Sequence, residues 1–228
     1  GLVCMAALAV GGCRKKGEEP LVRPAPPPLL CPEGYQLILD FEVGGGERYY
    51  QRHLARPSWP GGQSGVTVGV GYDLGYNEPA VIQRDWKALP RPHTVRLGEA
   101  SGIRGAAAKR KVPELADIVI GWRDAEAVFQ EVSLARFTSL ARRTYPGFDR
   151  LHRKAQAALV SLTFNRGSGM VGDRRRELRE IRACVARQDY AGMAYWNRAS
   201  IRIWKGTSLE AAMRRRREAE ARLMESGD

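Results

Sequence analysis

The sequence predicts an α+β protein that is predominantly α, and two patterns carry this expectation. Apolar residues recur at three- and four-residue spacing over several long stretches, which is typical of amphipathic helices. Within 65–76, valines alternate with threonine or glycine instead, which is typical of a strand or hairpin. The chain has 228 residues, of which 43% are hydrophobic, and it shows no internal repeat. It is long enough for one well-packed domain, which we place at 33–228.

The N-terminal residues 1–12 are uncharged, small and apolar, which is typical of the hydrophobic region of a signal peptide. No initiator Met and no basic region precede them, so we interpret the start as truncated. The Val-Gly-Gly-Cys sequence that ends at Cys13 resembles a bacterial lipobox, in which the cysteine is lipidated. An ordinary cleaved signal peptide or a short buried segment is the alternative. Because Arg14 rather than Asp follows the cysteine, we expect an exported, periplasmic protein that is lipid-anchored to the outer membrane of a Gram-negative bacterium.

Residues 14–32 are rich in proline and charge, so we expect a tether between the lipid anchor and the domain. Cys4 would be lost with the signal peptide. That leaves Cys31 and Cys184 as a pair that can form a disulfide in an oxidising compartment. Their spacing alone does not say whether they lie close enough. No Cys/His cluster indicates a metal site, and we expect no cofactor.

The first predicted helix of the domain covers 34–43 and ends at the glycines 44–46. Glu42 then lies in the last helical turn, where the helix dipole is negative. This is an unusual place for a carboxylate, and it suits a proton donor. The hairpin at 65–76 has little side-chain bulk on one face. Residues 77–113 give the weakest pattern, with short helical pieces among Pro and Gly.

The helices predicted for the rest of the chain share an apolar side and a capping residue or a glycine stop. They cover about 124–143 with Asp124 as cap and Pro146 and Gly147 as stop, about 151–165 with a stop at 165–167, 174–187, 189–198, and a last helix capped by Ser208.

Glu42, Thr67 and Asp73 are each ordinary alone: a solvated charge, a strand residue and a turn residue. Together they put two carboxylates and a hydroxyl beside glycine-rich backbone, which allows close approach of a bulky ligand. Glycosidic bond cleavage generally needs two carboxyl groups. One donates a proton, and the other activates water or attacks the sugar. This chemistry is therefore the first candidate.

The order of these features resembles the phage lysozyme superfamily. That superfamily places a catalytic Glu at the end of its first helix, then a β-hairpin with a Thr-hydrophobic-Gly-x-Gly run, then a helical lobe. Glu42 and the Thr-Val-Gly-Val-Gly run at 67–71 fit this order. Segment 158–167 looks like the long helix whose Phe-Asn-x-Gly end borders the cleft. An ordinary helix with an Asn/Gly cap would show the same pattern. Segment 203–220 resembles the C-terminal end of these lysozymes.

The arginines at 215–217 within that last segment predict, on physical grounds alone, a basic solvated face. The resemblance as a whole covers about 33–225. It implies a lysozyme-like fold with a small β-hairpin or sheet lobe and a helical lobe.

One departure from the common pattern indicates a particular branch. The usual Asp or Cys shortly before the Thr is missing, and Glu47 is the other carboxylate between Glu42 and Thr67. The pesticin-like branch has its Asp after the Gly-x-Gly, where this chain has Asp73. The resemblance therefore implies a pesticin-like muramidase with Glu42, Thr67 and Asp73 as its catalytic set. Segments 56–62 and 71–76 also look like this branch.

The resemblance implies cleavage of the β-1,4 bond between N-acetylmuramic acid and N-acetylglucosamine, and so a bacteriolytic, antimicrobial type of activity. Glu42 would protonate the glycosidic oxygen, and Asp73 would act on water with help from Thr67. Inversion is expected, with carboxyl groups roughly 6.5–9.5 Å apart.

Four residues are candidates for binding the sugar chain. Trp59, Tyr72 and Tyr76 are candidates for sugar stacking, with core packing as the alternative, and Asn165 borders the implied cleft.

The net charge of +12 implies a polyanionic partner, which can be nucleic acid, an anionic membrane or an acidic wall polymer. The arginine runs 174–176 and 214–217 could bind nucleic acid, but export from the cytoplasm argues against that partner. We expect a monomer that binds peptidoglycan strands and meets the membrane through the lipid on Cys13. A lytic transglycosylase, which needs Glu42 but no Asp, and a non-catalytic wall-binding lipoprotein are the alternatives. Self-wall remodelling, prophage lysis and antagonism stay open as roles.

Overall fold

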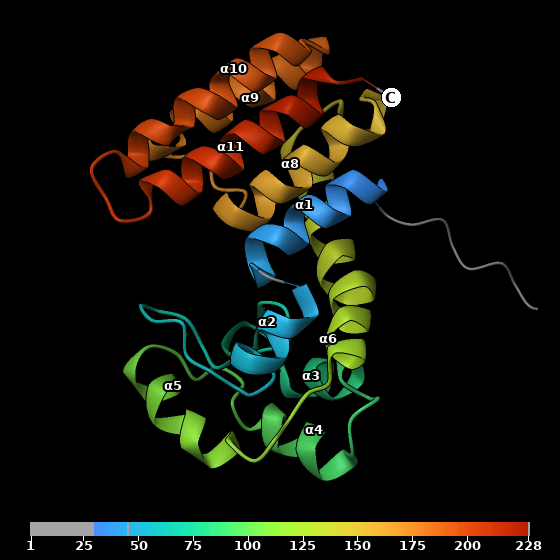
Figure 1. The fold of residues 1–228 in the computed structure, drawn as a ribbon, viewed down its shortest axis with the longest axis vertical. Coiled ribbons are helices and arrows are strands. Elements are labelled where there is room, and N and C mark those ends of the chain that lie inside the picture. The colour runs from blue at the N-terminus through green and yellow to red at the C-terminus, as the bar shows by residue number, and fades with distance from the viewer. Residues whose placement is uncertain (1–29, 45, 228) are drawn as a thin grey trace, which may run out of the picture.

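The computed structural model describes residues 30–44 and 46–227 of the chain (Figure 1). The predicted signal segment 1–12, the lipidation candidate Cys13 and nearly all of the tether lie outside the described residues. The first helix of the described residues starts at Pro32. In the described ranges, no helix has both the length and the apolar character needed to span a bilayer.

The protein is predominantly helical with one small antiparallel sheet, as the sequence predicts. The elements are α1 (Pro32–Val43), α2 (Gly46–His53), β1 (Thr67–Val68), β2 (Tyr72–Asp73), α3 (Pro79–Asp85), α4 (Arg91–Gly98), α5 (Ala106–Lys111), α6 (Trp122–Val128), α7 (Ala135–Thr144), α8 (Arg153–Arg166), α9 (Arg176–Arg187), α10 (Tyr190–Ala199) and α11 (Glu210–Glu225).

The elements gather at two ends of the molecule (Figure 1). Helices α1 and α8 to α11 lie together at one end, and α2 to α5 lie at the other. A continuous helix made of α6, the π-helical turn η3 (Phe129–Leu134) and α7 runs between them. Residues 77–113, where the sequence pattern was weakest, supply the three short helices α3, α4 and α5.

Two of the predicted caps are wrong, although the helices themselves form. The helix expected to start at Asp124 begins at Trp122, so Asp124 lies in its first turn, where a carboxylate favours the helix dipole. The last helix begins at Glu210 with Leu209 at the N-cap, not Ser208. The Glu210 carboxylate instead accepts the Gly206 amide at 2.7 Å, which orders the turn before the helix.

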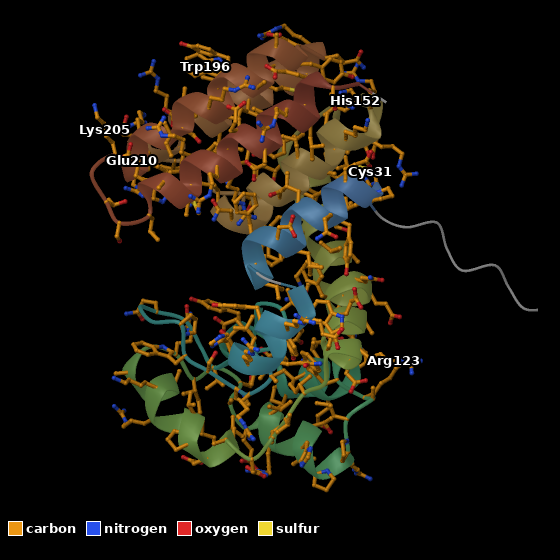
Figure 2. All side chains as sticks on the ribbon, viewed as in Figure 1. Cys31, Arg123, His152, Trp196, Lys205 and Glu210 are labelled. Carbon is orange, nitrogen blue, oxygen red and sulfur yellow. The ribbon has the colours of Figure 1, made fainter. Side chains whose placement is uncertain are left out.

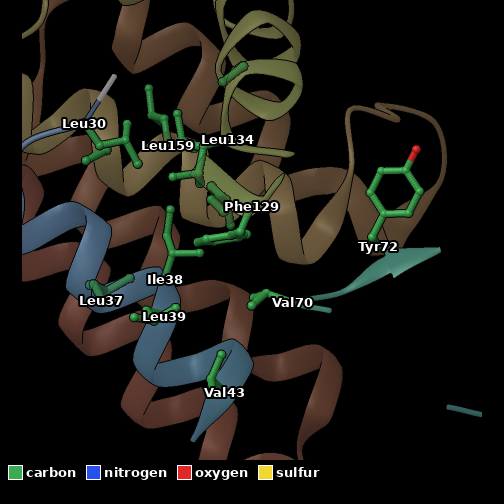
Figure 3. Close-up of a cluster of buried hydrophobic side chains, with 14 of the residues drawn as sticks. Leu30, Leu37, Ile38, Leu39, Val43, Val70, Tyr72, Phe129, Leu134 and Leu159 are labelled. Carbon is green, nitrogen blue, oxygen red and sulfur yellow. The ribbon is translucent and has the colours of Figure 1, made fainter. Parts of the chain in front are cut away.

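Helix α8 is the central helix of its lobe. Apolar residues on every side of it are buried, including Ala155, Leu159 and Leu162, which is the pattern of a helix enclosed by others. It contacts α1, α7 and α11. Figure 3 shows Leu159 in one buried cluster with Ile38 of α1 and Phe129 of η3. The cluster therefore joins the first helix to the central one.

The crossing of α1 and α8 depends on a glycine. A Cβ on Gly34 would lie 2.1 Å from the Cβ of Ala157, which is too close for two non-bonded carbon atoms. The absence of a side chain at Gly34 lets the two helices approach closely, and this sets the direction in which α1 carries Glu42.

We expect Gly34→Ala to lower the free energy of unfolding. Overpacking of a tight helix crossing costs about 1–3 kcal/mol, and this should exceed the roughly 1 kcal/mol that Ala gains over Gly in a helix. Thermal or urea unfolding checks this result. Gly169→Ala is the matched control, because a Cβ there meets only Arg175 Nε at 3.8 Å. Equal stability of Gly34→Ala and wild type would contradict the account of the crossing.

Candidate functional site

Glu42 lies in the last turn of α1, as predicted, and the helix ends one residue later at Val43. Gly44 adopts the left-handed conformation with φ of 65°, and its amide donates to the Asp40 carbonyl at 3.0 Å. The Glu42 side chain is 22% exposed, and its Oε1 accepts a hydrogen bond from Arg216 Nη1 at 2.7 Å. The carboxylate is thus held on one side by a cation and remains open to solvent on another.

Arg216 is itself fixed by buried partners. Its Nε donates to Glu220 Oε1 at 3.3 Å, and its Nη2 donates to both the carbonyl and the hydroxyl of Ser161 at 3.2 Å each. Its guanidinium also lies 5.4 Å from the centre of the Phe41 ring. The Arg216 side chain is only 3% exposed. Because α8 and α11 hold the guanidinium from several directions, the position of the Glu42 carboxylate is set by both helices.

The same network reaches Asn165. The Glu220 carboxylate accepts hydrogen bonds from Ser161 at 2.6 Å, Asn197 at 3.1 Å and Arg217 at 3.1 Å. Arg217 donates in turn to Asn165 Oδ1 at 3.0 Å. Burial lowers the pKa of Arg217. Asn165 therefore has a fixed orientation at the end of α8 and connects through Arg217 and Glu220 to the residues that hold Glu42.

The prediction of a basic solvated face at 215–217 is wrong for two of its three arginines. Arg216 and Arg217 are buried, and only Arg215 faces solvent. The physical reason is the helix period, because Arg216, Arg217 and Glu220 share the face of α11 that contacts α8. Glu42, Glu220 and Ser161 accept the hydrogen bonds of Arg216, whereas Arg217 bonds through Nη2 alone, to Asn165 and Glu220.

Thr67 and Asp73 are brought together by the hairpin. They are directly opposite in the antiparallel register, and the Leu74 amide donates to the Val66 carbonyl at 2.8 Å, so they form a non-hydrogen-bonded pair. In such pairs the side chains share one face, with Cβ atoms about 4.5–5.5 Å apart. On its other edge Thr67 exchanges both backbone hydrogen bonds with Ser58. The hydroxyl of Thr67 has no hydrogen-bond partner among the described residues, so it is available for water.

The Asp73 carboxylate also organises its own loop. Oδ1 accepts the amides of Gly65 at 3.1 Å and Gly75 at 2.8 Å, and Oδ2 accepts the Gly65 amide at 3.0 Å. Gly65 must be glycine here, because a Cβ would lie 2.3 Å from Asp73 Oδ1. Each carboxylate oxygen can accept two bonds. Within the described residues Oδ2 accepts only one, so it has the capacity for a water.

The turn of the hairpin lies against the end of α8. Gly71 has a left-handed φ of 70°, and a Cβ on it would lie 3.5 Å from the Phe164 ring. Phe164 precedes Asn165, which Arg217 orients. A chain of contacts therefore leads from the hairpin through the end of α8 to α11 and the Arg216 that holds Glu42. The segments that the sequence singled out at 42, 67–73 and 165 belong to this chain of contacts.

The three aromatic candidates for sugar stacking separate into one core residue and two surface residues. Tyr72 is buried, its hydroxyl donates to Asp85 at 2.8 Å and its ring meets Trp86 edge-on, so sugar stacking is wrong for it. Burial and the bond to Asp85 raise the pKa of Tyr72. Tyr76 is 60% exposed and lies 5.0 Å from the Arg104 guanidinium. Trp59 is half-buried and donates to the Ser64 carbonyl at 3.1 Å.

The suggested disulfide between Cys31 and Cys184 is wrong, because both are free and buried. Cys31 lies at the start of α1 (Figure 2), where its thiol approaches the Arg153 carbonyl at 4.0 Å. Cys184 lies on α9, where its sulfur accepts from Arg187 at 3.8 Å. Burial raises the pKa of both thiols. The two sulfur atoms thus take part in separate contacts, one at the start of α1 and one on α9.

Sequence reasoning missed Arg216, Ser161 and Glu220 as parts of the site. One signal was present: Arg216 and Glu220 lie four residues apart in a helix, on the same side as the apolar residues Ala221 and Met224. A charged pair on an apolar face predicts a buried network. No group of three or more His, Cys, Asp or Glu residues suited to a metal ion occurs in the described ranges.

A family model described as a domain of unknown function (DUF8812) matches residues 36–196. The chain belongs to this family. The DUF8812 match includes Glu42, Thr67, Asp73 and Asn165, and it ends before α11, which supplies Arg216. No curated protein matches the chain.

We expect Arg216→Met to destabilise the protein by about 3 kcal/mol, because it leaves the buried Glu220 without one of its cations. Urea or thermal unfolding measures this loss. The control is Arg215→Met, since the neighbouring Arg215 is exposed and a substitution there should stay within about 0.5 kcal/mol of wild type. Similar effects of the two substitutions would show that the Arg216 network does not hold the helices together.

Proposed function

We propose that this protein is a muramidase with a lysozyme-like fold of the pesticin-like branch. The observation that carries the proposal is the state of Glu42, a partly exposed carboxylate at the end of α1 held by the buried Arg216. A proton donor must be fixed in position and open to the substrate at the same time. The chain order of helix-end Glu, hairpin with Thr67 and Asp73, and helical remainder supports the same proposal.

In the proposed reaction Glu42 donates a proton to the oxygen of the bond between N-acetylmuramic acid and N-acetylglucosamine. Asp73, through the free capacity of Oδ2, accepts a hydrogen bond from a water, and the unpartnered Thr67 hydroxyl on the same face orients it. Water then attacks the sugar carbon from the opposite face and gives up a proton to Asp73. The bond to the glycosidic oxygen breaks as Glu42 protonates that oxygen, so the configuration is inverted. The proposed carboxyl separation of roughly 6.5–9.5 Å stays a prediction.

Peptidoglycan supplies the polyanion that the net charge of +12 calls for, through its peptide and lactyl carboxylates. Trp59 and Tyr76 are the surface aromatics proposed to contact sugars. Their side chains donate to neighbouring carbonyls of one loop, Trp59 to Ser64 and Tyr76 to Gln63. Export, the lipid anchor at Cys13 and a monomeric state belong to the same proposal.

A lytic transglycosylase is the second candidate, and one observation favours it. The Asp73 carboxylate makes three backbone hydrogen bonds to Gly65 and Gly75, so a purely architectural role would explain its presence. A transglycosylase needs the Glu42 acid but no Asp base. A non-catalytic wall-binding protein is the third candidate. Wall binding alone would not require a fixed, partly exposed carboxylate at Glu42.

Glu42→Gln should lower the rate of peptidoglycan hydrolysis at least about 100-fold, because a positioned general acid contributes factors of 10² to 10⁴. Clearing of a purified peptidoglycan suspension measures the rate. The control is Glu47→Gln, which removes an exposed carboxylate five residues away and should leave the rate unchanged. If Glu42→Gln clears peptidoglycan as fast as wild type, while circular dichroism shows both variants folded, the assignment fails.

A further inference from the structure

A pocket of about 530 Å³ lies beside the C-terminal end of α8. Its lining includes Arg166, Arg174, Arg175, Asn165 and Trp204. The arginines come from the end of α8 and from the short helix η5 (Asp173–Arg175) that precedes α9, and Trp204 ends the short helix η6 (Ser200–Trp204). We refer to this site as the arginine pocket. Its arginines have no role in the proposed catalytic reaction, and it shares Asn165 with the candidate sugar-binding residues.

Arg166 is buried in this pocket with a hydrogen-bonding group left over. The residue is 7% exposed, and its guanidinium lies 5.3 Å from the centre of the Trp204 ring. Nη2 donates to the carbonyl of Arg174, but Nη1 is buried and finds no partner among the described residues. Buried polar groups are rarely left unpaired, because an unmade hydrogen bond costs free energy. Arg166 thus places a largely buried cation beneath the pocket, as does Arg217, whose Nε and Nη1 are likewise unpaired within the described residues.

The positive charge of the pocket is also uncompensated. Within the described part of the chain, none of the lining arginines Arg166, Arg174 and Arg175 forms an ion pair. One carboxylate, Asp173, also lines the pocket, but it binds Arg202 at 2.8 Å, and Glu177 binds the same Arg202 at 2.5 Å. Burial, followed by the nearby charges of Arg175 and Arg217, lowers the pKa of Arg166 to about 10.

The hydrogen bonds that the arginines do make leave most of their donors unused. Arg175 donates to the Arg166 carbonyl at the end of α8. Arg174 donates to the Ile203 carbonyl near the end of η6 at 3.5 Å, so each arginine stabilises the end of a helix. A guanidinium has five N–H donors in a planar fork, and one bond each leaves the others for a ligand. A planar fork of this kind fits the two oxygens of a carboxylate or a phosphate.

We propose that the arginine pocket binds a small oxyanion group, a carboxylate or a phosphate, between Arg174 and Arg175 with Arg166 at its base. The group accepts hydrogen bonds from the unused donors of Arg174 and Arg175 and neutralises part of the charge of the three adjacent cations. The proposal does not depend on the muramidase activity. Asn165 lines the pocket and also binds Arg217, so an occupied pocket would stand next to the network that holds Glu42.

Isothermal titration calorimetry with two probes tests the proposal and separates the two sources. Inorganic phosphate represents phosphate groups, and N-acetylglycine represents peptide carboxylates, each added to the full chain in low-salt buffer without other oxyanions. At least one probe should bind. Arg174→Gln and Arg175→Gln should each weaken binding about tenfold, the effect of losing one charge-assisted hydrogen bond. Added chloride salt should weaken it as well.

Arg182→Gln is the matched control, because Arg182 is an exposed arginine of α9 outside the pocket and the change in net charge is the same. Binding to this variant should equal that to wild type. Arg174 is exposed, so its substitution should leave the unfolding temperature unchanged and the binding result interpretable. The proposal is overturned if neither probe binds, or if Arg182→Gln weakens binding as much as Arg174→Gln.

Discussion

The guanidinium of Arg216 connects more of this molecule than any other group described above. It binds Glu42 at the end of the first helix, Ser161 in the central helix and Glu220 in its own helix. Removing a charged group of this kind from water is costly unless every partner is present. The arrangement of α1, α8 and α11 is therefore coupled to the position of one partly exposed carboxylate. Stability and the proposed chemistry therefore share the same contacts.

The hairpin reaches this arrangement through backbone geometry rather than through charge. Glycine at 65 leaves room for the Asp73 carboxylate, and glycine at 71 lets the turn rest on Phe164 at the end of the central helix. The register then sets Thr67 and Asp73 side by side. Asp73 has two tasks in this account, since its oxygens order the loop and one of them retains room for water. A residue that orders the site and acts in it is difficult to substitute without affecting both.

Much of the fold could be predicted from local patterns. The helix ending at Gly44, the hairpin at 65–76 and the helix ending at Gly167 are set by glycine and by apolar spacing, which are properties of neighbouring residues. The remaining features depend on contacts between distant segments. Arg216 and Arg217 look solvated in a run of arginines, and only Ser161, Asn165 and Glu220 make their burial tolerable. The burial of Tyr72 likewise depends on a later helix, and the two cysteines belong to separate helix contacts.

The central claim is that the acid held by Arg216 and the carboxylate paired with Thr67 act together on one glycosidic bond. Mass spectrometry of the soluble products from purified peptidoglycan tests it most directly, with wild type beside Asp73→Asn, which keeps an acceptor oxygen for the loop amides. The account predicts fragments with reducing N-acetylmuramic acid ends from wild type, and a large loss of them from Asp73→Asn. Products with 1,6-anhydro ends that persist in Asp73→Asn, or no soluble products at all, would contradict it.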